Sequence, residues 1–558
     1  MKPIDGPPRR ALRTRWMAAG SVAVVTALVA TGVLSARADT GTGPAAGGAA
    51  RDPAIVRTGD GPVRGTVKAD HRSFQRIPYA APPVGELRWR SPRPAASWTA
   101  PRDATRPGAG CAQLAGLPMD APSESEDCLY LNVTTPRDIQ GKRLPVMVWL
   151  HGGHFLFGQG DTYGGASLAA RGDVIVVTMN YRLGALGFLA HPALDGPTPG
   201  ASGNFGLEDQ QAALRWVGRN AAAFGGDPGN VTLFGQSAGA TSVCAHLAAP
   251  SSAGLFHRVI TQSNSCTAPV QDRRTAEAQG RSLAAELNCG GTVRTAACLR
   301  ARPVAKVLKA VGYPGSGYDP GPVAGGPVLP VDPARALATG RFAKVPVMNG
   351  TTHDEYRGQL WGMERAGMNC PGGTPRPKPC PLTAKQYAEQ LEATFGDKAA
   401  AVREKYPLAG FGSPSEALAA AMTDHSYARP ALDADRLFAR QVPTYAYEFA
   451  DRQAPFFAGI PRTTFPAGAY HLAELPYLFA VGYADPLSAD QRGLSDQMLR
   501  YWARFAHRGD PNDAAAPRWP RFQASDRYVQ SLAPGHGGIG PADFAKDHHY
   551  EFWHSLGR

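Results

Sequence analysis

The chain has 558 residues, of which 43% are hydrophobic and 19% are charged. This apolar fraction is enough for a substantial core, and 50 prolines with 64 glycines indicate many turns and loops over it. The formal net charge is +12 at pH 7, but part of this excess lies in residues 1–38. No run of Lys and Arg interleaved with aromatic residues occurs, so we exclude a nucleic-acid partner.

The N-terminal segment, residues 1–38, has the pattern of a secretory signal peptide. Arginines precede an apolar run from Trp16 to Leu34, and Ala36-Arg37-Ala38 fits a small-x-small cleavage site. We predict cleavage after Ala38, a secreted extracellular protein and no stable membrane partner. An uncleaved anchor helix is the alternative, because the run is long enough to span a bilayer. The pair Arg9-Arg10 leaves open whether export follows the twin-arginine route.

Short apolar runs, typical of buried strands, recur along the rest of the chain and alternate with helix-like segments such as Glu208 to Asn220. This pattern predicts an α/β fold with a large, mostly parallel sheet covered by helices on both faces, and an active site at the carboxyl ends of the strands. The runs are Leu144 to Leu150, Val174 to Met179, Val231 to Gln236, Val259 to Thr261 and Val345 to Met348.

The run that ends at Gln236 leads into the motif Gly-Gln-Ser-Ala-Gly, with Ser237 between the predicted strand and a helix-compatible segment. Gly235 and Gly239 stand where side chains would collide if strand and helix closed on a sharp turn. This context predicts a nucleophile elbow with Ser237 as the catalytic serine. An ordinary glycine-rich turn is the alternative.

Longer motifs surround this serine and extend over nearly the whole chain. FGGDPGNVTLFGQSAG (224–239) resembles the active-site signature of the type-B carboxylesterase and cholinesterase family, and EDCLYLNVTTP (126–136) resembles its second signature, with Thr134 as a departure. The resemblance implies the α/β-hydrolase fold, with inserted loops and helices over the active site. It also implies one domain over residues 53–558, preceded by a flexible linker rich in Gly, Ala and Thr at 39–52.

A serine nucleophile needs a base and a carboxylate that orients it. His471 lies in GAYHLAELPYLF, which resembles the catalytic-histidine loop of the family, and Glu355 in NGTTHDEYRG matches its acidic position. The order serine, acid, histidine is that of the α/β hydrolases. Asp354 is the alternative acid. Glu474 is predicted to be a buried structural acid near the site.

The loop HGGHF (151–155) resembles the HGGG oxyanion loop of the family, so the backbone N–H groups of Gly153, His154 and Ala238 are the predicted oxyanion donors. His154 replaces a small residue, and we expect it to narrow the pocket and disfavour esters of bulky tertiary alcohols. Gln236 stands where the family often has Glu, and the segment between Cys111 and Cys128 contains no aromatic residue. Both features argue against a cholinesterase.

Eight cysteines in an exported chain indicate disulfides, since no CxxC or HExxH spacing appears. The resemblance implies the pairs Cys111–Cys128 and Cys289–Cys298. Proximity favours a pair of Cys370 with Cys380, which bracket a proline-rich segment. Cys244 and Cys266 stay open, because they could pair or Cys244 could be a small buried side chain.

These features together predict a serine carboxylesterase that hydrolyses small-molecule esters through an acyl-enzyme, with no metal or cofactor. A hydrolase of amides, lactones or carbamates and a lipase are alternatives on the same triad. A non-catalytic binding module is the alternative from another class. The natural substrate and the oligomeric state stay open.

Overall fold

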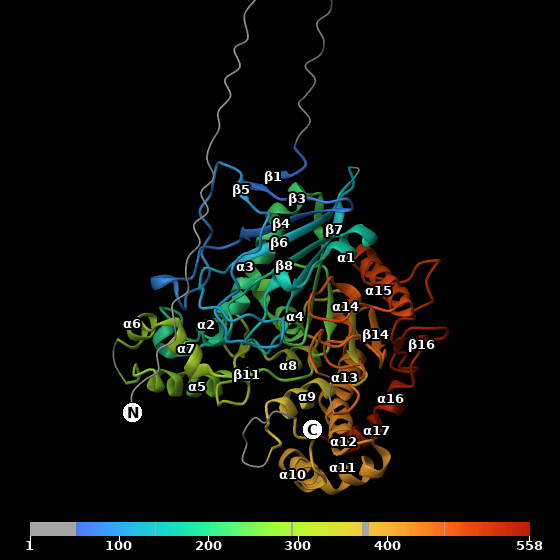
Figure 1. Ribbon diagram of the computed structural model, residues 1–558. Helices are drawn as coiled ribbons and strands as arrows, with labels where there is room; N and C mark the ends of the chain where they lie inside the picture. Colours follow the sequence, from blue (N-terminus) through green and yellow to red (C-terminus); the bar gives the residue numbers. More distant parts are fainter. Residues whose placement is uncertain (1–51, 140, 292–293, 371–378, 462–463, 558) are drawn as a thin grey trace, which may run out of the picture. The chain divides into compact units, whose positions relative to one another are not determined.

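The computed structural model describes residues 52–139, 141–291, 294–370, 379–461 and 464–557 (Figure 1). The predicted signal segment, 1–38, and all but the last residue of the predicted linker, 39–52, lie outside these ranges. Within the described ranges, no helix is both long enough and apolar enough to cross a membrane.

An eleven-stranded sheet lies at the centre of the described chain. Neighbouring strands pair in parallel from β8 to β15 and antiparallel at both sides of the sheet. The spatial order is β16 (Ile539–Pro541), β15 (Gln530–Leu532), β14 (Thr444–Phe449), β13 (Val347–Thr352), β10 (Arg258–Gln262), β9 (Gly226–Gln236), β7 (Leu144–Leu150), β8 (Ile175–Met179), β6 (Tyr130–Pro136), β4 (His71–Pro78) and β3 (Thr66–Val67).

The central strands are buried on both faces. All seven residues of β7 are buried, and its alternate side chains enter two different hydrophobic clusters: Met147 and Trp149 lie in one, Val146 and Val148 in the other. A parallel sheet covered on both sides has this property. Burial on both faces explains why the central strands appear in the sequence as uninterrupted apolar runs. The predicted fold class is confirmed.

Helices cover the two faces. Leu207 and Val243, from α3 (Phe205–Asn220) and α4 (Ala238–Ala248), join one cluster. Leu168 and Trp502, from α1 (Ala166–Gly172) and α15 (Ala489–Arg508), join the other, and these two helices contact each other (Figure 1). The remaining strands and α-helices outside the insertion and the C-terminal segment are β1 (Ile55–Arg57), β2 (Pro62–Arg64), β5 (Arg102–Asp103), β11 (Gln271–Asp272), β12 (Val323–Ala324), α2 (Gly184–Phe188), α5 (Arg273–Glu286), α6 (Thr295–Arg300), α7 (Val304–Val311), α8 (Pro333–Ala338) and α14 (Leu475–Leu478).

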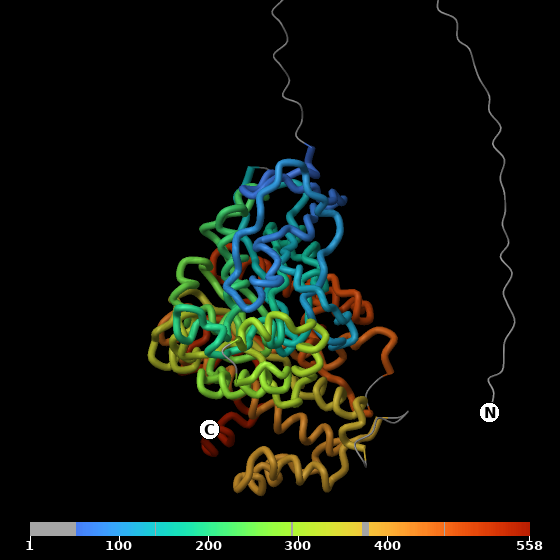
Figure 2. Tube along the Cα trace, turned by 90° about the vertical axis from the view of Figure 1, so that its left-hand side faces the viewer, coloured from blue at the N-terminus to red at the C-terminus, as the bar shows by residue number. Residues whose placement is uncertain are grey.

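A helical insertion separates β13 from β14. Its helices are α9 (Arg357–Arg365), α10 (Ala384–Phe395), α11 (Ala399–Lys405), α12 (Pro414–Thr423) and α13 (Arg429–Phe438), with a π-helical segment, Asp424–Ala428, between the last two. The C-terminal helices α16 (Phe544–Asp547) and α17 (Tyr550–Ser555) lie beside this insertion in both views (Figures 1 and 2).

Disulfides join Cys111 to Cys128, Cys289 to Cys298 and Cys370 to Cys380. A fourth bond joins Cys244 in α4 to Cys266 after β10, the pair that the sequence left open. All eight cysteines of the chain are therefore paired.

The strand register brings the ends of four strands together. Leu150 of β7 pairs with Gly235 of β9, and Gln262 of β10 pairs with both Gln236 and Gly350. The loops that follow β7, β9 and β13 therefore start from one edge of the sheet. These loops carry the HGGHF motif, Ser237 and Glu355.

Candidate active site

Ser237 occupies a sharp turn between β9 and α4, with φ 57° and ψ −123°. A positive φ is unfavourable for a residue with a side chain and is typical of a nucleophile elbow. The flanking glycines make the turn possible. A Cβ on Gly239 would lie 2.0 Å from the carbonyl oxygen of Leu150, and one on Gly235 would lie 2.6 Å from the carbonyl carbon of Gly239.

His471 and Glu355 form a short hydrogen bond, with 2.5 Å between His471 Nδ1 and Glu355 Oε2. The other carboxylate oxygen of Glu355 accepts from the backbone N–H of Thr352 at 2.8 Å. Glu355 is completely buried. Both of its oxygens therefore have donors, and the carboxylate can orient the imidazole and stabilise its cation.

Asp354, the alternative acid, faces different partners. Its carboxylate pairs with Arg357 at 3.0 Å and Arg452 at 2.9 Å, and it accepts from the backbone N–H of Ala469. The structure therefore brings Glu355, and not its neighbour, to His471.

Two contacts connect the histidine with the serine turn. The side-chain amide of Gln236, the residue before Ser237, donates to the carbonyl oxygen of His471 at 2.7 Å. Tyr427 lines the cavity that contains Ser237, and its ring packs edge-on against the imidazole of His471 with 5.4 Å between centroids. The serine, the histidine and the acid thus lie in one region.

The predicted oxyanion residues lie on the same side. Gly153 has φ 106°, and a Cβ there would lie 2.1 Å from the carbonyl oxygen of Phe157. His154 also has a positive φ, 54°. Ala238 is the first residue of α4, where a backbone N–H has no carbonyl within the helix to bind. A helix N-terminus and a turn with unusual backbone angles are suitable places for oxyanion donors.

His154 reaches solvent through the cavity but is surrounded by protein atoms, and this desolvation lowers the pKa of its imidazole. The nearby His471 lowers this pKa further, whereas Asp319 opposes the shift. His154 is therefore held towards its neutral form beside the serine.

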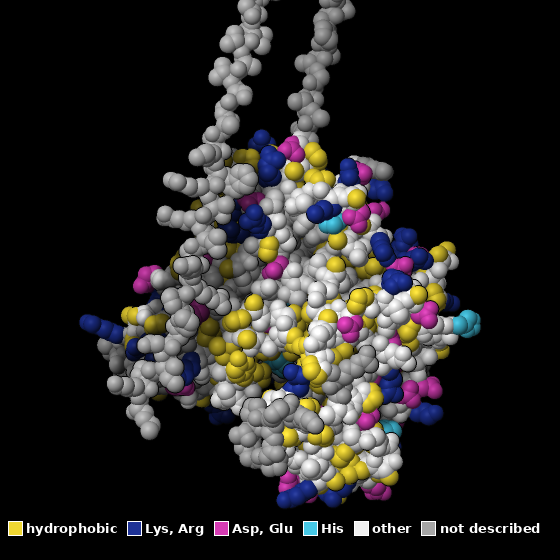
Figure 3. All heavy atoms as spheres, in the orientation of Figure 1, with side chains coloured by type: hydrophobic (Ala, Val, Ile, Leu, Met, Phe, Trp, Pro, Cys, Tyr) yellow, Lys and Arg dark blue, Asp and Glu magenta, His cyan; other side chains and the backbone are white. Residues whose placement is uncertain are grey.

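The cavity at Ser237 has a volume of about 280 Å³. Its wall combines apolar and polar side chains, and in Figure 3 apolar side chains gather on the face around β11 and α9. Several lining residues were not found by sequence reasoning. They come from α4, the segments after β10 and before β12, and the π-helical segment, which are far apart in the sequence. These residues are Thr241, Ser263, Asn264, Pro269, Val270, Gln271, Asp319, Pro320, Gly321, Pro322 and Tyr427.

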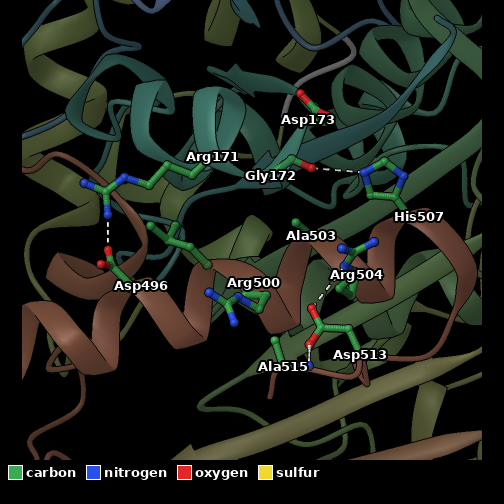
Figure 4. A pocket seen from close by; sticks show the side chains of 11 residues that line it. Arg171, Gly172, Asp173, Asp496, Arg500, Ala503, Arg504, His507, Asp513 and Ala515 are labelled. Carbon is green, nitrogen blue, oxygen red and sulfur yellow. Dashed lines mark hydrogen bonds and ion pairs between the residues drawn. The ribbon is translucent and has the colours of Figure 1, made fainter.

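A larger cavity, about 600 Å³, lies between α1 and α15, away from the serine (Figure 4). Its charged side chains are largely paired with each other: Arg171 with Asp496, and Arg504 with Asp513 at 3.3 Å. It contains no serine or cysteine nucleophile among the residues that line it. The larger of these two cavities is therefore not the one that contains the predicted nucleophile.

Glu474 lies behind the predicted triad. It is fully buried, and burial, with a further contribution from the charge of Glu355, raises the pKa of its carboxyl to about 8. Gln262 donates to one of its oxygens at 3.2 Å. A neutral carboxyl at this place adds no second negative charge beside Glu355.

A serine at a strained elbow, on a mostly parallel sheet covered on both faces, defines an α/β-hydrolase. A model of the carboxylesterase family matches residues 52–553. The chain is 35% identical over 511 residues to human "Cocaine esterase", an alignment that covers 86% of each chain. It is 33% identical over 500 residues to "Para-nitrobenzyl esterase" of Bacillus subtilis, over 86% of this chain and 94% of that one.

A solved structure of a PNB esterase is similar over 90% of this chain and 100% of its own, with a TM-score of 0.72 and 32% identity. The chain belongs to the carboxylesterase family, and it is a carboxylic ester hydrolase.

Proposed function

We propose that the protein is a secreted serine carboxylesterase in which Ser237, His471 and Glu355 form the catalytic triad. The observation that carries this proposal is the 2.5 Å hydrogen bond between Glu355 and His471 on the loops that meet the strained Ser237 turn. A carboxylate bound to Nδ1 fixes the imidazole tautomer so that Nε2 is free to accept the serine proton.

In the proposed reaction, His471 takes the proton of Ser237 as Oγ attacks the ester carbonyl carbon. The tetrahedral intermediate collapses when His471 gives that proton to the leaving alcohol, and an acyl-enzyme remains. Water, deprotonated by His471, attacks the acyl-enzyme. The second tetrahedral intermediate then releases the acid as His471 returns the proton to Ser237 Oγ.

The oxyanion of both intermediates would bind the backbone N–H groups of Gly153, His154 and Ala238. Two observations support these donors: Ala238 is the first residue of a helix, where the backbone N–H has no carbonyl within the helix to bind, and Gly153 has φ 106° in the loop after β7. Donors of this kind contribute about 3–4 kcal/mol each to transition-state stabilisation.

The substrate class follows from the cavity. A volume of about 280 Å³ suits a small-molecule ester. A relative from Sphingopyxis macrogoltabida, "Fumonisin B1 esterase", is 35% identical over 518 residues, and the names of the three relatives point to different esters. Those names therefore support ester hydrolysis, but they do not identify the alcohol or the acid part of the ester that this protein cleaves.

The test is a series of p-nitrophenyl esters of increasing acyl length, with Ser237→Ala as the control. We expect rapid hydrolysis by the wild type, an optimum acyl length set by the cavity and loss of activity in the variant. Activity on amides or lactones but on no ester would favour the alternative hydrolases. Equal inactivity of both proteins on every substrate would favour a binding module.

We further propose that the protein is exported, with cleavage after Ala38, so that residues 39–52 precede a single hydrolase domain over 53–558. The signal-like sequence at 1–38 supports this proposal, and the four disulfides are typical of an oxidising compartment. N-terminal sequencing of protein recovered from the culture medium tests it. A mature chain that begins at Asp39 is expected, whereas an intact N-terminus in the membrane fraction would support the anchor alternative.

A further inference from the structure

A cluster of metal-ligating side chains lies outside the cavity that contains Ser237. Both His353 Nδ1 and His548 Nε2 lie 2.7 Å from the same carboxylate oxygen, Oε1 of Glu448. The three ligand atoms lie within 4.8 Å of one another. The side chains of Glu448 and His548 are 4% exposed, and that of His353 is 25% exposed.

Main-chain geometry fixes this arrangement. His353 directly follows β13, and its backbone N–H donates to the carbonyl oxygen of Phe449 at 2.9 Å. Glu448 lies in β14, the neighbouring strand, opposite Thr351. His548 lies in the turn between α16 and α17. Three elements far apart in the sequence thus present their ligand atoms to one point.

A second layer of hydrogen bonds orients His548. Its Nδ1 lies 2.6 Å from Asp424, whose other oxygen accepts from the hydroxyl of Tyr406 at 2.6 Å. The indole N–H of Trp553 donates to that hydroxyl at 2.7 Å. A carboxylate on the far nitrogen of a histidine is the arrangement that fixes the tautomer of a metal-binding imidazole. It leaves Nε2 as the ligand atom.

The two histidines of the cluster line a cavity, whereas Glu448 lies behind them. A cavity of about 270 Å³ is lined by His353, His548 and Asp424, together with polar neighbours that include Arg452 and His549. An ion can enter through it, and a water molecule in it can complete the coordination.

We propose that His353, Glu448 and His548 bind one divalent cation of the Zn²⁺ class, with Asp424 as the outer partner. Two imidazoles and one carboxylate suit Zn²⁺ and not Mg²⁺ or Ca²⁺, which take oxygen ligands. Ligand atoms at about 2.0–2.1 Å from a tetrahedral ion are roughly 3.3 Å apart. For an ion to replace the shared protons, the two 2.7 Å separations widen by about 0.6 Å, and the two imidazole nitrogens, which lie within 4.8 Å of each other, move to about the same 3.3 Å.

The ion has a structural role. It joins the C-terminal turn at His548 to the loop after β13, and Glu355 lies two residues beyond His353 on this loop. The ion does not contact the ester substrate. It stabilises the loop that presents Glu355 to His471.

The test is titration of the purified full-length protein, after treatment with a chelator, with Zn²⁺ by calorimetry and with Co²⁺ by visible absorption. We expect one ion per chain, the absorption of a four-coordinate nitrogen and oxygen site, and a melting temperature that rises with metal concentration. His353→Gln and Glu448→Gln should each weaken binding at least 100-fold, and Asp424→Asn about 10- to 100-fold.

The matched control is His549→Gln, because His549 lines the same cavity but lies outside the cluster. It should bind the ion as the wild type does. His353→Gln removes a partly exposed side chain with one hydrogen bond, and near-ultraviolet circular dichroism of the variant can show that it folds. The proposal is overturned if the wild type binds no ion at equimolar ratio, or if the folded His353→Gln protein binds it unchanged.

Discussion

The side-chain amide of Gln236 donates a 2.7 Å hydrogen bond to the carbonyl oxygen of His471. The residue before the serine thus supports the loop of the histidine through its main chain. The family often has Glu at this position. An ionised carboxylate cannot donate a hydrogen bond, so Gln236 makes a contact that a Glu would not make.

We expect Gln236→Met to reduce kcat more than it changes KM. The variant keeps the side-chain volume but leaves the carbonyl oxygen of His471 without this donor, which costs about 1–3 kcal/mol of stability. Urea denaturation and initial rates measure the two effects. An unchanged kcat, with normal stability, would show that this bond does not position the histidine.

Glu355→Gln and Asp354→Asn distinguish the two adjacent acids. Glu355→Gln should lower kcat by about 10,000-fold, because an amide favours the wrong imidazole tautomer. Asp354→Asn should change kcat far less, since Asp354 binds Arg357 and Arg452 instead of His471, and should mainly lower thermal stability. The reverse order of the two kcat values would assign the catalytic role to Asp354.

Glu474 should make the stability of the protein dependent on pH. Its folded pKa of about 8 exceeds the value of 4.5 for an ordinary Glu, so the folded state holds one more proton than the unfolded chain between these limits. The free energy of unfolding should therefore fall as the pH rises through this window, by up to about 1.4 kcal/mol per pH unit.

Glu474→Gln keeps the shape of the side chain and removes its titration. Urea denaturation of both proteins at several values between pH 5 and pH 8 measures the difference. As the pH rises, the variant should lose less stability than the wild type. Parallel curves for the two proteins would contradict a raised pKa at Glu474.

His154→Gly should increase the hydrolysis of esters of bulky tertiary alcohols by about tenfold or more relative to acetate esters of small alcohols. The change removes an imidazole from the wall of the cavity and suits the positive φ of this residue. Ratios of kcat/KM for the two ester classes test it. No gain for the bulky class would mean that His154 does not limit the pocket.

The double variant Cys244→Ala/Cys266→Ala should lose about 3 kcal/mol of stability, because the disulfide closes a loop with a sequence separation of 22 residues. Thermal denaturation without reductant measures the loss. Since Cys244 lies in the helix that follows Ser237, a fall in activity below the melting temperature would also indicate that this bond holds the elbow.

The sequence was most informative where physical constraints are local. The apolar runs located the central strands to within a few residues, although β9 begins at Gly226 and β13 extends to Thr352. Strands of two or three residues, such as β3 and β15, have too few side chains for a recognisable period.

The features that the sequence did not reveal depend on distant contacts. The bond between Cys244 and Cys266 requires α4 to lie against the segment after β10, and no spacing rule encodes that. Asp319 reaches the cavity from the segment before β12, and Tyr427 reaches it from the π-helical segment Asp424–Ala428. His548 contacts Glu448 and Asp424, which lie 100 and 124 residues away in the sequence.

The close approach of Gly239 to Leu150 has an evolutionary consequence. With only a hydrogen atom between the first turn of α4 and the end of β7, main-chain contact sets the distance from Ser237 to the loop after β7. Side chains of the cavity wall can therefore be exchanged without altering that distance. Substrate preference can therefore change through the cavity wall while Ser237 and the loop after β7 keep their spacing.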